Sequence, residues 1–288
     1  MRETSKRGLT RHKNIVFRRN HAQLEQTIKM LKSSGQRFDV LHSSYSTSIE
    51  FEDKKKILYT TFSYRDKVFQ ASRCIVKDLK ENPLADIIRG QEWPKINFDS
   101  KNGWEPKKCK AVINIDISKA YASCLLNSGL IKPNTFQFLN SLRKYERLPA
   151  VGMIAKRGIV YRYNQGECVS FDKVEGEWTQ IFFYIIAQVN SVMQDCQRIA
   201  GKDYCFHWVD GIFVDHRIDK QKLKDIELCL QDAGYSYKYE KCENFSAYRD
   251  EDKVHVSMTK NDEPKNYCFK DPNFNRNYRD MLERIRLE

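Results

Sequence analysis

The sequence predicts an α+β fold in which an antiparallel sheet is backed by helices on one face. From residue 111 onward, the apolar pattern follows the order strand, helix, hairpin, helix and hairpin. The second hairpin is CFHWVDGIFVDH at 205–216, where two β-rich runs meet at an Asp-Gly pair whose glycine would supply the positive φ of the turn. The helix before it, EWTQIFFYIIAQVNSVMQDCQRIAG, has an apolar face broad enough to be buried. This order is typical of layered α+β folds.

The first hundred residues predict a basic arm followed by a small α/β region. Residues 1–19 are basic and poor in apolar side chains, so we expect an arm there. Within 20–100, NHAQLEQTIKMLKSSG predicts a helix capped by Asn20 and stopped at Gly35. FDVLHSS and KKILYTTF predict strands, and DKVFQASRCIVKDLKEN predicts a second helix. The Pro, Gly and Asn residues of 81–108 favour a connection between two regions.

The rest of the chain predicts a larger domain over 101–274 and a final helix over 275–288. AVINIDIS predicts a strand ending in an acid, and KAYASCLLNSG predicts a short helix closed by Gly129. VGMIAKRGIVYRY predicts a β-hairpin with its turn at 156–158. After the Asp-Gly hairpin, DKQKLKDIELCLQDAG predicts an amphipathic helix, and YSYKYEKCENF and KVHVSM predict further strands.

The composition favours a folded protein with a polyanionic partner. Hydrophobic residues make up 41% of the 288-residue chain and aromatic residues 12%, which suits a packed core. Lys and Arg number 50 against 38 Asp and Glu, so the net charge is +12. Such an excess favours nucleic acid first and an anionic membrane surface second, with plain solubility as the alternative.

The nine cysteines and the hydropathy of the chain indicate its cellular location. The cysteines form no C-x-x-C pair and no Cys/His group with zinc-ligand spacing, so we interpret them as reduced core thiols. No apolar run approaches the length of a membrane span, and the N-terminus lacks the apolar core of a signal peptide. We therefore expect no membrane association and a cytoplasmic, intracellular location.

Two acids stand at the ends of predicted strands. Asp116 lies near the end of AVINIDIS, and Asp210 lies at the turn of the hairpin. If the two strands are neighbours, their backbones lie about 4.8 Å apart, and the two carboxylates could together hold two divalent cations, Mg²⁺ or Mn²⁺, about 3.5–4 Å apart. Such ions prefer hard oxygen ligands, which Asp supplies. The alternative is that Asp116 caps the next helix and Asp210 fills a turn, but the two acids together favour a metal site.

The contexts of these acids resemble motifs of family B DNA polymerases. DISKAYAS is similar to motif A, Asp-x-x-Ser-Leu-Tyr-Pro-Ser, with Asp116, Tyr121 and Ser123 at matching positions. WVDGIFV resembles motif C, Tyr-x-Asp-Thr-Asp-Ser, with Asp210 in the place of the second, catalytic aspartate. Trp208 stands where the family has the first aspartate.

A third likeness is PKNYCFK, in which Lys265 and Tyr267 match the family's Lys-x-Tyr motif, especially that of its protein-primed branch. The three motifs keep the family's order over roughly residues 108–270. The resemblance implies a polymerase-type palm, an antiparallel sheet of the ferredoxin- or RRM-like kind backed by helices. It also implies that Lys265 contacts the primer end and that Tyr267 supports it. The alternative is an ordinary solvated lysine beside a strand tyrosine.

The resemblance assigns roles to the other matching residues. Asp116 and Asp210 would be the catalytic acids and the metal ligands. Tyr121 and Ser123 would bind the incoming nucleotide, with Tyr121 beneath its sugar, where it would exclude a ribose 2′-hydroxyl. The alternative for Tyr121 is a core aromatic on a short helix.

The chain departs from the family in two places. The fingers motif Lys-x-x-x-Asn-Ser-x-Tyr-Gly is not found between motifs A and C. A reduced fingers element could still gather the triphosphate through clustered cations, with a solvated basic loop as the alternative. These nucleotide-binding candidates are Arg143, Lys144 and Arg147. The region before the palm is also too short for a proofreading exonuclease.

We therefore expect a minimal nucleotidyltransferase, either a DNA polymerase or a primase-like enzyme of a phage or mobile element. It would add dNTPs to a primer on DNA, with a protein primer or an accessory replication protein as further partners. The alternative is a catalytically inactive palm that serves as a nucleic-acid-binding or regulatory subunit, which the missing fingers motif and first motif C acid favour. A reverse-transcriptase-like enzyme is disfavoured because motif C lacks paired aspartates.

Overall fold

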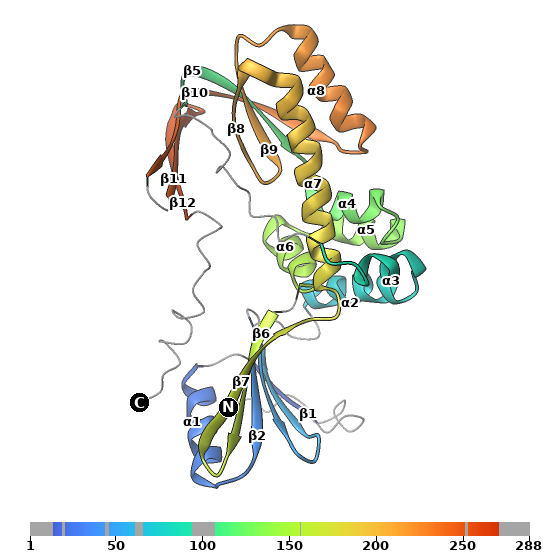
Figure 1. Ribbon diagram of the computed structural model, residues 1–288, viewed down its shortest axis with the longest axis vertical. Coiled ribbons are helices and arrows are strands. Elements are labelled where there is room, and N and C mark those ends of the chain that lie inside the picture. The colour runs from blue at the N-terminus through green and yellow to red at the C-terminus, as the bar shows by residue number, and fades with distance from the viewer. Residues whose placement is uncertain are drawn as a thin grey trace. The chain divides into compact units, whose positions relative to one another are not determined.

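The computed structural model describes residues 14–18, 21–43, 46–60, 66–93, 107–155, 157–250 and 253–270. The chain divides into two compact units, Met1–Glu92 with Leu130–Phe182, and Trp93–Gly129 with Phe183–Glu288. Each unit contains a six-stranded sheet, and helices accompany both sheets (Figure 1). The predicted α+β class is confirmed.

The sheet of the first unit has the strand order β1-β4-β3-β2-β6-β7. Its strands are β1 (Asn14–Arg18), β2 (Phe38–Ser43), β3 (Ser46–Phe51), β4 (Lys56–Thr60), β6 (Arg157–Asn164) and β7 (Glu167–Glu175). β1 and β4 run parallel, whereas the other neighbouring pairs are antiparallel. The helices of this unit are α1 (His21–Ser33), α2 (Lys67–Lys80), α3 (Pro83–Arg89), α5 (Pro133–Ser141) and α6 (Lys144–Gly152).

Residues 130–182 belong to the first unit, so this division differs from the boundary predicted at residue 100. The physical reason is pairing, because β6 lies beside β2 and α6 packs against α2. Gly158 permits the close approach of β6 to β2, since a Cβ there would lie 2.4 Å from the carbonyl oxygen of His42. A segment between Asp116 and Asp210 thus completes a sheet begun near the N-terminus.

Several predicted elements of this unit are corrected. The expected hairpin with its turn at 156–158 is wrong, because α6 precedes that point and the hairpin joins β6 to β7 instead. The connection expected over 81–108 contains α3, whose N-cap Asn82 accepts a hydrogen bond from the Leu84 N–H at 3.0 Å. Residues 14–18 form β1 and do not continue an arm, while the rest of the expected arm and the helix expected over 275–288 lie outside the described residues.

The sheet of the second unit is antiparallel throughout, with the order β12-β11-β10-β5-β9-β8. Its strands are β5 (Lys107–Ile117), β8 (Tyr204–Trp208), β9 (Gly211–Asp215), β10 (Tyr237–Asp250), β11 (Lys253–Lys260) and β12 (Glu263–Lys270). The helices are α4 (Ala120–Asn127), α7 (Thr179–Ala200), which begins in the first unit, and α8 (Lys220–Asp232). A 3₁₀ turn, Gly201–Asp203, joins α7 to β8.

The core of this unit follows a known supersecondary pattern. β5, α7, β8, β9, α8 and β10 give the chain order βαββαβ, and these four strands lie in the spatial order β10-β5-β9-β8. Fourth, first, third, second is the arrangement of the ferredoxin-like motif. The hairpin of β11 and β12 extends the sheet beyond β10, and β12 was not anticipated as a strand. Within the described residues, no helix is long and apolar enough to cross a membrane.

The two faces of this sheet are both apolar but differ in what covers them. Ile115, Ile117, Ile212 and Val214 are buried on the face that the helices back (Figure 1). On the other face the strands enclose an apolar cluster of their own. Its buried members are Val112, Cys205, Phe206, Cys242, Phe245, Ala247, Val254, Val256 and Met258. A register shift in β10 near Phe245 changes which residues of the strand face this side of the sheet. Cys242 before the shift and Phe245 after it therefore both belong to the cluster.

Candidate functional site

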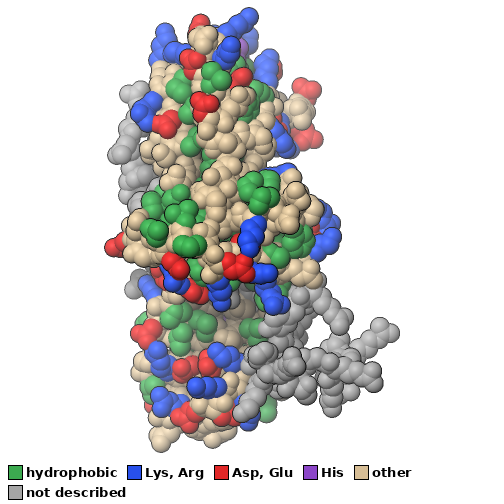
Figure 2. All heavy atoms as spheres, turned by 90° about the vertical axis from the view of Figure 1, so that its right-hand side faces the viewer, with side chains coloured by type: hydrophobic (Ala, Val, Ile, Leu, Met, Phe, Trp, Pro, Cys, Tyr) green, Lys and Arg blue, Asp and Glu red, His purple; other side chains and the backbone are tan. Residues whose placement is uncertain are grey.

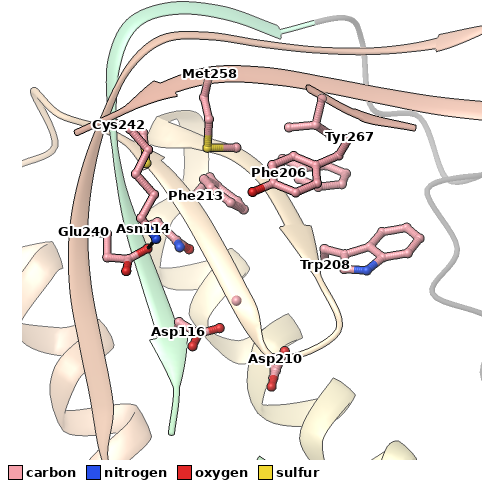
Figure 3. Close-up of a pocket in the computed structure, with 13 residues that line it drawn as sticks. Asn114, Asp116, Phe206, Trp208, Asp210, Phe213, Glu240, Cys242, Met258 and Tyr267 are labelled. Carbon is pink, nitrogen blue, oxygen red and sulfur yellow. Dashed lines mark hydrogen bonds and ion pairs between the residues drawn. The ribbon is translucent and has the colours of Figure 1, made fainter. Parts of the chain in front are cut away.

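Asp116 on β5 and Asp210 in the turn between β8 and β9 lie at one end of this second face (Figure 3). The register places Asp116 opposite Gly211, the first residue of β9. The Ile117 N–H donates to the Asp210 carbonyl oxygen at 2.8 Å, which fixes the hairpin tip against the end of β5. The two strands are neighbours, as the predicted metal site requires, and the role of the two acids as ligands stays a prediction.

The hairpin turn has an unexpected conformation. Trp208 pairs with Gly211, so Val209 and Asp210 are the two turn residues. Val209 has a φ of 55°, whereas Gly211 does not have a positive φ. A positive φ at the first turn residue alone is typical of a type II′ turn, where glycine is the usual residue. A β-branched residue in this region is strained, and strained residues gather at functional sites. The expectation that the glycine supplies the positive φ is therefore wrong.

Gly211 instead lies close to two side-chain oxygen atoms of β5. A Cβ at this position would lie 3.4 Å from Asp116 Oδ1 and 3.4 Å from Asn114 Oδ1. Two oxygen atoms from alternate residues of β5 thus lie next to Gly211, on the side where any other residue would carry its Cβ. Figure 3 shows the two side chains, Asn114 and Asp116, on the same face of β5. A glycine in this place keeps a small oxygen-lined space open beside the acids.

These oxygens lie at one end of a pocket that every strand of the sheet helps to line. The edge strands β8 and β12 both contribute, so the sheet curls around the pocket. Trp208 and Phe206 of β8 stack with ring centroids 6.3 Å apart. The lining residues are Asn114, Asp116, Phe206, Trp208, Asp210, Gly211, Phe213, Glu240, Cys242, Val256, Met258, Lys260 and Tyr267. The pocket therefore joins an oxygen-rich end to apolar and aromatic walls (Figure 3).

Tyr121 and Ser123 follow the acid strand on α4. The pKa of Tyr121 is raised, first by burial and second by the negative charge of Asp210, which places this tyrosine in the electrostatic field of the acid. Ser123 is 7% exposed, and its hydroxyl donates to the Ser118 carbonyl oxygen at 3.2 Å. The structure thus groups Tyr121 with the acids, whereas Ser123 closes the turn into the helix.

Lys265 and Tyr267 lie on β12, where the period of two puts them on one face of the strand. Tyr267 lines the pocket and is 43% exposed. Lys265 forms an ion pair with Glu263 at 2.5 Å. The lysine and tyrosine of the third motif therefore belong to the same sheet as the two acids, with the tyrosine at the pocket wall.

The three cations expected to gather a triphosphate lie in the first unit. Lys144 begins α6, and Arg143 precedes it with an ion pair to Glu146 at 3.1 Å. The Arg147 guanidinium donates to the Leu142 carbonyl oxygen at 3.0 Å, and burial lowers its pKa. They stand on and beside a helix, which replaces the basic loop considered as an alternative. The pocket lining contains none of the three.

Sequence reasoning missed Asn114, Glu240 and Lys260. Asn114 precedes Asp116 by two residues, so the alternation of side chains along a strand would have placed it on the same face. Glu240 and Lys260 form an ion pair at 2.6 Å. Their position on the pocket depends on the pairing of three strands, for which the sequence holds no local signal.

The donor atoms at this end of the pocket suit a hard divalent cation. Within the described residues, no group of three or more His, Cys, Asp or Glu is placed to hold a metal. Asp116, Asp210 and Asn114 nevertheless offer carboxylate and carboxamide oxygen atoms, the ligands that Mg²⁺ and Mn²⁺ prefer. Asn114 Oδ1 is buried without a hydrogen-bond partner in the described structure. A buried, unpaired oxygen beside a carboxylate is suited to bind the expected Mg²⁺ or Mn²⁺ ion.

The sequence matches no model of a known protein family and no curated protein. A functional assignment therefore depends on the geometry of the pocket and on the sequence motifs that contribute residues to its lining.

Proposed function

We propose that the protein is a palm-type nucleotidyltransferase, a DNA polymerase or primase-like enzyme that adds nucleotides to a primer. One observation carries the proposal. The strand that ends in Asp116 lies in the middle of a ferredoxin-like sheet, directly beside the hairpin whose tip is Asp210. The resemblance of the two acid motifs to polymerase motifs A and C supports the same reading.

Asp116 and Asp210 would hold Mg²⁺ or Mn²⁺. Bound in such a site, these ions promote loss of a hydroxyl proton and offset charge on the transferred phosphate. The chain's own part is to fix both carboxylates on a paired strand and a tight turn, so that little reorganisation accompanies the reaction. Tyr121 is protonated at neutral pH, as tyrosines ordinarily are, and burial raises its pKa further. Its hydroxyl can therefore donate a hydrogen bond to a nucleotide.

The reaction is a transfer of a nucleotidyl group. The primer hydroxyl oxygen forms a bond to the α-phosphorus of the nucleoside triphosphate, its proton leaves to solvent, and the bond to the bridging oxygen breaks. Pyrophosphate departs with that bonding pair. Lys265 on β12 would contact the primer end. The cations Arg143, Lys144 and Arg147 remain candidates for the triphosphate.

The net charge of +12 supports DNA as the primer and template. The Lys265 and Tyr267 motif supports a protein primer or an accessory replication protein as a further partner, since it most resembles that of protein-primed enzymes. We propose a cytoplasmic enzyme of a phage or mobile element in a prokaryotic host.

A second function has an observation in its favour. Trp208 stands in the place of the first motif C acid, and it lines the pocket with an aromatic ring where polymerases have a carboxylate. A palm that binds nucleic acid without catalysis would tolerate that change. Such a regulatory subunit would bind DNA in a salt-sensitive manner and would need no divalent cation.

Incorporation of labelled nucleotides tests the proposal. The purified protein is given dNTPs or NTPs with Mg²⁺ or Mn²⁺ on primed, unprimed and template-free substrates. Asp116→Asn and Asp210→Asn should each abolish incorporation, whereas Asp232→Asn at the end of α8 should leave it unchanged. Full activity in either site variant would overturn the mechanism. DNA binding without incorporation by the unmodified protein would favour the regulatory subunit.

A further inference from the structure

Asn114 carries a buried oxygen that the described fold does not satisfy. Its Oδ1 is buried and has no hydrogen-bond partner among the described residues. Buried acceptors are nearly always paired, and an exception calls for an explanation such as a bound ion or a functional role. The face of β5 that carries Asn114 also carries Asp116.

The location of this oxygen narrows the explanation. Asn114 Oδ1 and Asp116 Oδ1 each lie 3.4 Å from the point that a Cβ of Gly211 would occupy. Asp210 is the residue before that glycine in the hairpin turn. A carboxamide oxygen and a carboxylate oxygen therefore face one small space beside Gly211. Figure 3 shows Asp116 between Asn114 and Asp210, so the acid of β5 is next to both.

Two carboxylates fill only part of the coordination shell of Mg²⁺, which takes six oxygen ligands. Water and phosphate oxygens usually fill the rest, and a neutral protein oxygen nearby can take one of these positions. Glu240 is the other carboxylate of the pocket lining, and its ion pair with Lys260 at 2.6 Å already engages it. Glu240 stands opposite Asn114 in the register of β10 and β5. With Glu240 paired, the Asn114 carboxamide supplies the nearest remaining side-chain oxygen to Asp116 along the same face of β5.

We propose that Asn114 is a third protein ligand, through Oδ1, of a divalent cation held by Asp116 and Asp210. The inference rests on the proposed function, since it takes the two acids as ligands. A carboxamide adds an oxygen without a third negative charge, so the site repels an incoming phosphate less than three carboxylates would. Gly211 is the residue that leaves room for this arrangement.

Direct binding of Mn²⁺ tests the assignment without any nucleotide or turnover. The electron paramagnetic resonance signal of free Mn²⁺ is followed while the full-length protein is titrated. Asn114→Leu removes the oxygen at similar shape, and Asn114→Asp retains one. Gly211→Ala fills the space and leaves the ligands in place. Asn266→Leu on β12 is the matched control, because Asn266 does not line the pocket.

Asn114→Leu and Gly211→Ala should each weaken Mn²⁺ binding by about 10- to 100-fold. Asn114→Asp and Asn266→Leu should bind at least as tightly as the unmodified protein. Wild-type affinity in Asn114→Leu, with weakened binding in Asp116→Asn and Asp210→Asn, would remove Asn114 from the site and leave the nucleotidyltransferase proposal standing.

Wild-type affinity in the two aspartate variants as well would overturn both proposals. Circular dichroism shows whether each variant folds. If Asn114→Leu does not fold, the Mn²⁺ affinity of Gly211→Ala tests the assignment instead. This variant should fold, because the φ of Gly211 is not in the left-handed region and alanine is compatible with the backbone there. Unchanged affinity in that variant would overturn the assignment.

Discussion

Replacing Asn114 by leucine should make the cation-free protein more stable. The amide oxygen is buried and lacks a partner in the described structure, and such a group costs about 1–3 kcal/mol. Leucine has a similar shape and puts apolar carbon in its place. The neighbouring side chains Val112 and Cys242 belong to an apolar cluster on the same sheet face, so they suit that carbon. We expect the free energy of unfolding to rise by about 1–3 kcal/mol in the presence of a chelator.

Divalent cations should reverse this advantage. A ligand that binds only the folded protein stabilises it by RT ln(1 + [L]/Kd), which is about 2.7 kcal/mol at a concentration 100 times Kd. The unmodified protein should gain about this amount in Mn²⁺. The leucine variant should gain less, because it lacks one of the three proposed ligands. Removal of a functional oxygen would thus exchange activity for stability, as is common at binding sites.

Urea denaturation measures both effects. Unfolding is followed by circular dichroism in EDTA and again in Mn²⁺, with Asn266→Leu as the control for a leucine introduced elsewhere in the sheet. A leucine variant less stable than the unmodified protein in EDTA would refute the reasoning, since it would mean that the amide makes contacts worth more than its unsatisfied oxygen costs.

Three further predictions follow from electrostatics and packing. Asp210→Asn should lower the pKa of Tyr121, because the charge of Asp210 helps to raise it. Burial should still keep that pKa above its usual value. The pKa is followed by ¹³C-tyrosine NMR, and an unchanged value would mean that the two groups do not interact. Arg217→Ala should raise the pKa of Asp215 from about 2 toward 3.8, since the Arg217 hydrogen bond lowers it. The carboxylate contributes stability above pH 4 that is lost as the pH falls to 2, so this loss should shrink in the variant, and an unchanged acid denaturation curve would count against the coupling. Gly158→Ala should destabilise the first unit by about 1–3 kcal/mol in thermal or urea unfolding, because its Cβ would meet a carbonyl oxygen of β2 at 2.4 Å, and a neutral effect would contradict that packing.

The elements that sequence predicted best are those whose pattern is local and strong. The long apolar face of α7, the alternation in β5 and the two β-rich runs around Asp210 each determine their own conformation. The order of these elements was enough to predict the α+β class. The adjacency of Asp116 and Asp210 was only a condition of the predicted metal site, and the pairing of β5 with β9 meets that condition.

What sequence missed depends on contacts between distant segments. β6 joins β2 across more than a hundred residues, and β12 is a mostly polar strand that is defined by its pairing with β11. The turn at Val209 contradicts local propensity, since tertiary packing holds a valine where glycine is favoured. α3 did carry a local signal, the Asn82 cap before a proline, which was outweighed by the Pro and Gly content around it.

The discontinuous makeup of the second unit has a consequence for biosynthesis. β5 leaves the ribosome before the whole of 130–182, and its pairing partners β9 and β10 follow only after that segment. The first unit can complete its sheet once β7 has emerged, while the strand that ends in Asp116 still has both edges open. Non-local strand pairing is slow, and open edges invite aggregation. The nascent chain is therefore most exposed to misfolding in the interval between the synthesis of its two acids.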